Sequence, residues 1–314
     1  MGDENRPPDY SPASLRRVPE SLAGLRLDQA LARMFPEHSR SRLQHWLRAG
    51  HIRLDSRAAK PKQKIWGGEQ IEIAPQPDPS QTAYRPERIA LAVVHEDDDV
   101  LVVNKPAGLV MHPGSGNWKG TLLNALLEHA PATAALPRAG IVHRLDKDTS
   151  GLVVVAKTLE AQTGLVRQLQ ARTVRREYLA LVRGAVKSDG EISGAVGRHP
   201  RVRTRMAVVA GGKPALTRYR VLKRYAGATL LHCSLATGRT HQIRVHMQSI
   251  GHPLVGDPVY RDRRGARADA RLDAFPRQAL HAARLSFLHP RAGAAVAFEA
   301  PVPDDLRALL DALA

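Results

Sequence analysis

The sequence predicts an α+β fold, in which a large domain with a mixed, largely antiparallel sheet follows a small domain with two helices. Short runs rich in β-branched residues follow one another with few helices between them, which favours antiparallel pairing. Residues 152–156 are an unbroken apolar run that is too short for a helix, so we expect a strand buried on both faces. A proline-rich stretch over residues 75–88 predicts a linker between the domains.

The composition indicates a binder of polyanions. The chain carries a formal net charge of +17, and a globular protein this basic commonly binds nucleic acid. Its single cysteine, Cys233, excludes a disulfide framework and suits the reducing cytosol. We find no signal peptide and no apolar run approaching the roughly 20 residues that a membrane span needs. We therefore expect a cytoplasmic protein without a membrane partner.

The first part of the chain predicts a tail and a small basic domain. Residues 1–20 are polar and proline-rich, and we expect them to be disordered. Residues 21–74 contain two amphipathic helical patterns, followed by alternating strand patterns at 52–54 and 70–73. This arrangement resembles the S4 RNA-binding domain, whose helix pair docks on RNA backbone. The expected RNA contacts in this domain are Arg40, Arg42, Arg48 and Arg53.

The large domain is predicted over residues 89–314. Thr121 precedes a leucine-rich helical pattern as a cap should, and Gly251 ends the helix that we expect from Thr240 onwards. The expected strands include 89–94, 100–103, 216–222, 230–235, 280–282 and 294–298, and a last helix is expected over 304–312.

The most informative stretch of this domain is 140–157. His143-Arg144-Leu145-Asp146 is followed by turn-forming or charged residues at 147–151, and then by the buried strand. Asp146 therefore lies on a tight turn that is joined directly to the core. Such a position holds a side chain rigidly while leaving it accessible, as catalysis requires.

This stretch resembles motif II of the RluA family of RNA pseudouridine synthases, in which His-Arg-Leu-Asp precedes Thr-Ser-Gly. The resemblance covers most of the chain and is closest to the RluD type. It implies that Asp146 is the catalytic residue. Arg-Glu-Tyr at 176–178 matches the family segment whose tyrosine packs against the target base, which implies that role for Tyr178. The segment 237–246 matches a signature whose final arginine, here Arg244, pairs with the catalytic carboxylate.

Further RNA contacts are expected around these motifs. Arg144 and His143 stand beside Asp146, and Lys105 lies in a loop that resembles the family's motif I. We interpret Lys105 as a structural or RNA-facing residue. Basic loops commonly track phosphates, and three more arginines are expected to do so: Arg201, Arg203 and Arg239.

The implied reaction explains these residue types. Converting uridine to pseudouridine breaks the N-glycosidic bond and rejoins the base through C5, which needs no cofactor and no metal. An enclosed aspartate must stay ionised to attack C1′ or to assist deprotonation at C2′, and Arg244 would offset the cost of burial. Tyr178 would supply a face for the base. The resemblance implies 23S ribosomal RNA as partner and helix 69 as target. We expect a monomeric enzyme.

Several alternatives stay open on the sequence alone. Asp146 and Asp148 could form the carboxylate pair of a glycoside hydrolase, and the charge would suit a non-catalytic S4-type RNA-binding protein. An RluC-type synthase would share the motifs but modify other uridines. Zinc binding by His241 and His246 is disfavoured, because residues five apart lie about 140° apart around a helix. A membrane-surface protein would need a lysine-rich amphipathic helix, which we do not find.

Overall fold

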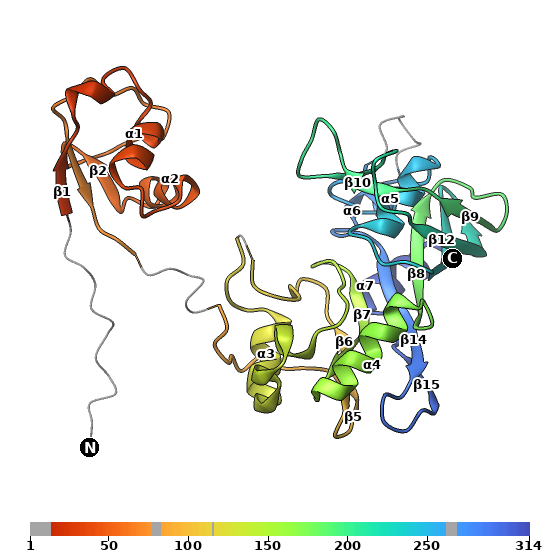
Figure 1. Ribbon diagram of the computed structural model, residues 1–314. Helices are drawn as coiled ribbons and strands as arrows, with labels where there is room; N and C mark the ends of the chain where they lie inside the picture. Colours follow the sequence, from red (N-terminus) through yellow and green to blue (C-terminus); the bar gives the residue numbers. More distant parts are fainter. Residues whose placement is uncertain (1–13, 77–82, 115, 262–268) are drawn as a thin grey trace. The chain divides into compact units, whose positions relative to one another are not determined.

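The computed structural model describes residues 14–76, 83–114, 116–261 and 269–314. The chain divides into two compact units, Met1–Gln81 and Thr82–Ala314, which we call the N-terminal unit and the C-terminal unit (Figure 1). Each has its own hydrophobic core. None of the helices in the described ranges combines the length and apolar character that crossing a membrane requires.

The N-terminal unit packs two helices against a small sheet. Leu27, Leu31 and Leu43 are fully buried between these layers. Ser39 caps the second helix by accepting the backbone N–H of Arg42. The elements are β1 (Ser14–Arg17), a 3₁₀ turn (Glu20–Leu22), α1 (Leu27–Met34), α2 (Arg40–Arg48), β2 (Ile52–Leu54), β3 (Arg57–Ala58) and β4 (Gln70–Ile73), with sheet order β1-β4-β2-β3.

The predicted disordered tail is wrong from residue 14 onwards. Strand β1 pairs antiparallel with β4, from Ser14 opposite Ile73 to Arg17 opposite Gln70. Val18 follows it and is 2% exposed, so it joins the core. Backbone pairing along an open strand edge stabilises a segment whose polar composition gives little sign of structure. Residues 1–13 lie outside the described part of the chain.

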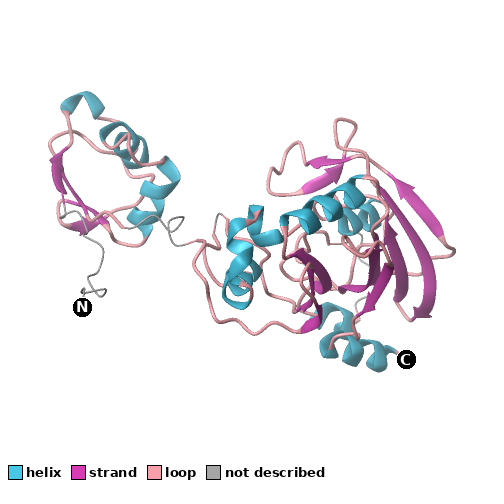
Figure 2. Cartoon of the chain, turned by 60° about the horizontal axis from the view of Figure 1, so that its bottom comes forward, coloured by secondary structure: helices cyan, strands magenta, loops and turns pink. Residues whose placement is uncertain are grey.

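The C-terminal unit is built on one large mixed sheet (Figure 2). Its strand order is β5-β6-β7-β14-β8-β13-β12-β9, with β15 beside β14, and β10 pairs separately with β11. The strands are β5 (Val93–Glu96), β6 (Val100–Lys105), β7 (Ser150–Ala156), β8 (Arg175–Arg183), β9 (Gly190–Ser193), β10 (Val196–Arg198), β11 (Met206–Val208), β12 (Leu216–Tyr225), β13 (Ala228–Leu235), β14 (Leu280–Leu288) and β15 (Ala295–Glu299).

Helices cover both faces of this sheet. Successive residues of β7 alternate between two cores: Val153 and Val155 pack with α3 and α5, whereas Val154 packs with α4. The predicted strand is therefore buried on both faces, as expected. The helices are α3 (Leu122–His129), α4 (Leu159–Gln170), α5 (Gln242–Ser249), α6 (Ala270–Ala274) and α7 (Asp304–Leu313), with 3₁₀ turns at Pro131–Ala135 and Pro137–Gly140.

The pairing of β7 with β14 is parallel, while the other strand pairs described in this sheet are antiparallel. Gly151 stands opposite Ala282 at this junction. A Cβ on Gly151 would lie 2.2 Å from the Ala282 carbonyl oxygen, and its φ of 112° also suits glycine. The close approach of β14 thus explains the glycine that follows the Asp146 turn. The sheet confirms the predicted mixed, largely antiparallel α+β class.

Two predicted boundaries differ from the structure. Asn124 of α3 donates hydrogen bonds to the carbonyls of Ala83 and Arg85. The end of the predicted 75–88 linker is therefore fastened to the C-terminal unit, while residues 77–82 lie outside the described chain. The strand expected over 89–94 begins only at Val93, because residues 89–92 make few ladder hydrogen bonds.

Candidate active site

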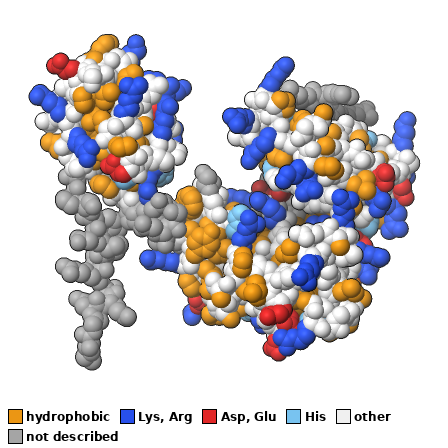
Figure 3. Space-filling view, in the orientation of Figure 1, with side chains coloured by type: hydrophobic (Ala, Val, Ile, Leu, Met, Phe, Trp, Pro, Cys, Tyr) orange, Lys and Arg blue, Asp and Glu red, His pale blue; other side chains and the backbone are white. Residues whose placement is uncertain are grey.

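A pocket of about 720 Å³ lies in the C-terminal unit and collects six of the nine site residues expected in that unit. Asp146, Tyr178 and Arg244 all line it, together with Arg144, His143 and Arg239. These residues come from the turn before β7, from β8 and from the start of α5. Figure 3 shows Lys and Arg side chains gathered around a hollow in this unit. The pocket is therefore lined by several arginines, and the carboxylate of Asp146 lies among them.

The turn that carries Asp146 is held by hydrogen bonds to its backbone. The Lys105 ammonium and the Gly108 N–H both donate to the Lys147 carbonyl, at 2.9 and 3.0 Å. Arg277 donates to the Asp148 carbonyl at 3.2 Å, and the Thr149 N–H closes the turn onto the Asp146 carbonyl. The carboxylate of Asp146 is therefore fixed in direction although its side chain stays 16% exposed.

Arg244 links two carboxylates. Its Nη1 donates to Asp146 Oδ2 at 2.9 Å, while Nε and Nη2 grip both oxygens of Asp257 at 2.7 and 2.9 Å. Asp257 is fully buried and also accepts the backbone N–H groups of Val259 and Tyr260. Burial opposes the charge of Arg244, but hydrogen bonding to Asp257 and the Asp146 carboxylate raise its pKa. The guanidinium thus remains a fixed cation beside Asp146.

His241 completes this wall of the pocket and contacts Tyr260. His241 has a left-handed φ of 56° at the start of α5, and its Nδ1 lies 2.9 Å from the Tyr260 hydroxyl. Its Nε2 lies 3.8 Å from Asp146 Oδ1. Burial lowers the pKa of His241, and the nearby Asp146 charge opposes this effect. The hydrogen bond to Tyr260 fixes the orientation of the His241 ring in the wall of the pocket.

Tyr178 lies on the face of β8 that turns from the core into the pocket. It is 5% exposed and packs with Ala180 and Val182. Burial raises the pKa of its phenol, and the charge of Arg176 opposes that rise. A largely buried ring at a pocket wall offers a flat apolar surface to a planar ligand.

Lys105 does not fit an RNA-facing role, and His143 lines the pocket only as an uncharged ring. Lys105 is fully buried, and its Nζ donates to the carbonyls of Pro106, Leu109 and Lys147. Three acceptors match the three N–H groups of an ammonium, and burial lowers the pKa of Lys105 to about 7. The structural reading of Lys105 holds, because no face remains for a phosphate.

His143 is also unsuited to binding phosphate through charge. Its Nε2 accepts the Val154 N–H at 3.1 Å, so Nδ1 carries the ring hydrogen. Burial, followed by the charge of Arg176, lowers the pKa of His143 to about 3. The neutral ring therefore ties the Arg144–Asp146 segment to β7.

The remaining predicted contacts fall into two groups. Arg144 and Arg239 line the pocket, whereas Arg201 and Arg203 lie exposed in the loop between β10 and β11. In the N-terminal unit Arg48 and Arg53 are exposed. The other two lie close to fixed partners there: Arg40 donates to the buried Asp28 at 2.7 Å, and Arg42 stacks over Trp46.

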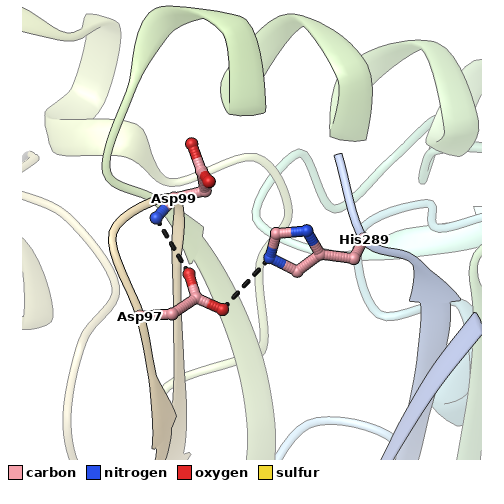
Figure 4. Close-up of side chains that lie close together, drawn as sticks. All are labelled: Asp97, Asp99 and His289. Carbon is pink, nitrogen blue, oxygen red and sulfur yellow. Dashed lines mark hydrogen bonds and ion pairs between the residues drawn. The ribbon is translucent and has the colours of Figure 1, made fainter. Parts of the chain in front are cut away.

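A cluster of metal-ligand type lies away from this pocket. Asp97, Asp99 and His289 bring ligand-type atoms within 4.8 Å of one another (Figure 4). Asp97 already accepts the N–H groups of Asp99 and Val100 on one oxygen and a hydrogen bond from His289 on the other. Burial opposes ionisation, yet these donors lower the pKa of Asp97. The cluster therefore fastens the turn between β5 and β6.

Comparison with known proteins decides what this architecture is. A family described as RNA pseudouridylate synthase matches residues 99–249, and the S4 domain matches residues 25–71. The chain is 58% identical over 300 residues to "Ribosomal large subunit pseudouridine synthase D" of Nitrosomonas europaea, covering 94% of this chain and 86% of that protein. The chain belongs to the RNA pseudouridylate synthase family. It is therefore an isomerase with an N-terminal S4 domain, and the non-catalytic alternative is excluded.

Other relatives agree with this family. A protein of the same name from Xanthomonas campestris pv. campestris is 51% identical over 319 residues, covering all of this chain and 96% of that protein. Among solved structures, human RNA pseudouridylate synthase domain containing 1 is 30% identical with a TM-score of 0.55, covering 72% of this chain and 96% of that chain.

Sequence reasoning missed several residues of the site. Asp257 and Tyr260 stand in Gly-Asp-Pro-Val-Tyr, where an aspartate after glycine suggests only a turn. His241 was considered only as a zinc ligand. Arg176 precedes Tyr178 by two residues, so strand alternation could have placed it on the same face. No sequence pattern reveals that Asp257, 13 residues further along the chain, binds Arg244.

We predict that Lys105→Met destabilises the protein without weakening RNA binding. The change removes the donor of the Pro106 and Leu109 carbonyls, while the Lys147 carbonyl keeps the Gly108 N–H, and it should lower the free energy of unfolding by about 3 kcal/mol. Urea unfolding followed by circular dichroism measures this loss. The salt dependence of RNA binding should match wild type, with Arg48→Met as a matched exposed control. A lowered salt slope in Lys105→Met would restore the RNA-contact interpretation.

Proposed function

We propose that this enzyme converts specific uridines of large-subunit (23S) ribosomal RNA to pseudouridine, with Asp146 as the nucleophile. The observation that carries the proposal is the Asp146 carboxylate in the pocket, held by Arg244 at 2.9 Å. The names of the relatives described above support the large ribosomal subunit as the source of the RNA.

The pocket suits the steps of this isomerisation. The Asp146 carboxylate attacks C1′ or assists deprotonation at C2′, and the N1–C1′ bond breaks with its electron pair kept by the uracil. The released ring turns against Tyr178 until C5 faces the sugar. A C5–C1′ bond then forms as the Asp146–C1′ ester bond breaks, or, on the C2′ route, as the proton returns to C2′. The C5 proton leaves and N1 gains a proton. Atoms and electrons balance without an oxidant, a reductant or a cofactor.

The surroundings of the pocket suit an extruded nucleotide. A paired or stacked uridine cannot reach a recessed carboxylate, so the base must leave its stack. Arg144, Arg138 and Arg172 are exposed at the pocket, where they can neutralise the phosphates on either side of the flipped residue. The S4 domain, with Arg48 and Arg53 exposed, adds contacts to RNA backbone.

Helix 69 is the target that we propose within this RNA, acted on by a cytoplasmic, monomeric enzyme. An RluC-type specificity for other uridines is the competing proposal. Mapping pseudouridines in ribosomal RNA from a deletion strain separates them. Loss of the modifications in helix 69, restored by the wild-type gene, is the expected result. Loss at other uridines alone would replace helix 69 as the target.

We predict that Asp146→Asn abolishes isomerisation while RNA binding persists. The amide keeps the shape of the side chain but cannot serve as a nucleophile, so the single-turnover rate should fall by at least about 10³-fold. Tritium release from C5-labelled uridine in a stem-loop RNA measures the reaction. Asp148→Asn, on the same turn, is the control and should stay active. More than a tenth of wild-type activity in Asp146→Asn would refute the assignment.

We predict that Arg244→Met moves the acid limb of the pH–rate profile to higher pH. The opposite charge favours the ionised carboxylate, so its removal favours the protonated and inactive form. Arg244→Lys should recover only part of the rate, since lysine cannot hold Asp257 with two nitrogens and Asp146 with a third. Single-turnover rates at saturating enzyme give both profiles.

The competing interpretation of Arg244 is a contact to RNA phosphate. It predicts weaker RNA binding in Arg244→Met, a lower salt slope and an unmoved acid limb. That combination would assign Arg244 to the RNA surface.

We predict that Arg48→Ala together with Arg53→Ala weakens RNA binding but spares the chemical step. Each lost phosphate contact should lower the slope of log affinity against log salt by about 0.7–0.9. Filter binding at several salt concentrations measures the slope, and single-turnover rates at saturating enzyme should remain within about twofold of wild type. A slow chemical step in this variant would show that the S4 domain helps to form the active site.

A further inference from the structure

Arg176 is a buried cation for which the described residues provide no partner. Among these residues three arginines are buried: Arg176, Arg244 and Arg277. Arg244 and Arg277 each hold an aspartate with two nitrogens. The Arg176 side chain makes no hydrogen bond or ion pair within the described ranges, and its Nε is buried without an acceptor. A buried charge is normally paired. We therefore infer that this guanidinium binds a hydrogen-bond acceptor of a ligand, which the protein itself does not supply.

The position of Arg176 identifies where that partner must lie. Alternate residues of β8 run from the core, through Val182 and Ala180, to Tyr178 and then to Arg176. Arg176 is 8% exposed and lines the same pocket as Asp146 and Tyr178. The guanidinium therefore stands on the same strand face as the tyrosine proposed to contact the base.

Gly238 keeps space for this guanidinium. A Cβ on Gly238 would lie 2.6 Å from Nη1 of Arg176. Gly238 has no left-handed φ that would require glycine there, so the open space is a reason for the glycine. The charge of Arg176 also reaches its neighbours, since it opposes the rise in the Tyr178 pKa and helps to lower that of His143.

The chemistry of the reaction supplies a matching anion. When the N1–C1′ bond breaks, the electron pair stays on the uracil, and its negative charge spreads from N1 to O2 and O4. This holds whether Asp146 attacks C1′ or C2′ loses a proton. A phosphate would instead meet the exposed arginines of the pocket, Arg138, Arg144 and Arg172. A cation set deep beside the base-contacting tyrosine is better placed for the base.

We propose that the Arg176 guanidinium hydrogen-bonds a carbonyl oxygen of the target uracil and stabilises the uracil anion released on glycosidic cleavage. The inference rests on the proposed function, because it takes Tyr178 as the residue that contacts the base. A preorganised donor aimed at developing charge contributes most in a site that excludes water.

The test compares two RNAs that differ in how easily the base leaves. A stem-loop carries either uridine or 5-fluorouridine at the modified position, and fluorine makes the uracil anion less basic. Single-turnover consumption of the starting nucleoside at saturating enzyme is followed by nuclease digestion and mass spectrometry, because fluorine at C5 blocks the final loss of a C5 proton but not glycosidic cleavage. Arg176→Met should slow uridine conversion by about 10²–10³-fold, as when one oxyanion donor is lost. The loss on 5-fluorouridine should be at least tenfold smaller, with RNA affinity unchanged.

Matched variants keep the result interpretable. Arg175→Met removes the same charge from the neighbouring, exposed position of β8 and should behave as wild type on both RNAs. Gly238→Ala displaces the guanidinium while keeping its charge, and Arg176→Lys keeps a cation without the planar fork. Both should lose less than Arg176→Met, with the same bias towards uridine. If Arg176→Met does not fold, this bias in the two milder variants decides the question.

The outcomes that would overturn the role of Arg176 differ from the outcome that would refute the proposed target. Equal losses on both RNAs, or a wild-type rate in every Arg176 variant, would overturn the inference. A lower salt slope with an unchanged rate would make Arg176 a phosphate contact and would also overturn it. A wild-type enzyme that converts neither RNA would refute the proposed target instead.

Discussion

The site depends on one guanidinium that joins two carboxylates, Asp146 and Asp257, at the wall of the pocket. Arg244 holds Asp257 with two of its nitrogens and offers the third to Asp146. Breaking such a buried arrangement by removing one member leaves an uncompensated charge. The Arg244 guanidinium therefore fixes three segments relative to one another: the turn before β7, the start of α5 and the segment after α5. Their arrangement around this group shapes one wall of the pocket.

Two further buried basic residues hold the backbone of the turn that carries Asp146. Lys105 and Arg277 donate to the carbonyls of Lys147 and Asp148, directly after Asp146. Lysine and arginine can satisfy several carbonyls at once, which lets a tight turn lose its solvent without leaving acceptors unpaired. The formal charge of +17 is consequently larger than the charge that can face RNA, since some of these cations are buried and bind backbone carbonyls.

The class of fold and the core of the site were predictable because their signals are local. The β7 run, the capped helix α3 and the turn carrying Asp146 each follow from residues close together in sequence. The strand β1 was not predictable, because its stability comes from pairing with β4, more than 50 residues away. Lys105 was ambiguous for a similar reason: the three carbonyls that enclose it include Lys147, which no local pattern reveals. The role of Asp257 becomes clear only when folding brings it to Arg244. That of Arg176 becomes clear only when the folded structure shows that no partner lies near it among the described residues.

The place of β14 in the sheet has a consequence for how the enzyme is made. β14 lies between β7 and β8, which precede it by more than 90 residues. The half of the sheet that carries Asp146 and the half that carries Tyr178 are thus joined by a strand that follows both of them at a long distance in the chain. Such long-range pairing is slow to form and leaves strand edges open meanwhile. The pocket between Asp146 and Tyr178 can therefore form only after β14 has been synthesised and has paired with both β7 and β8.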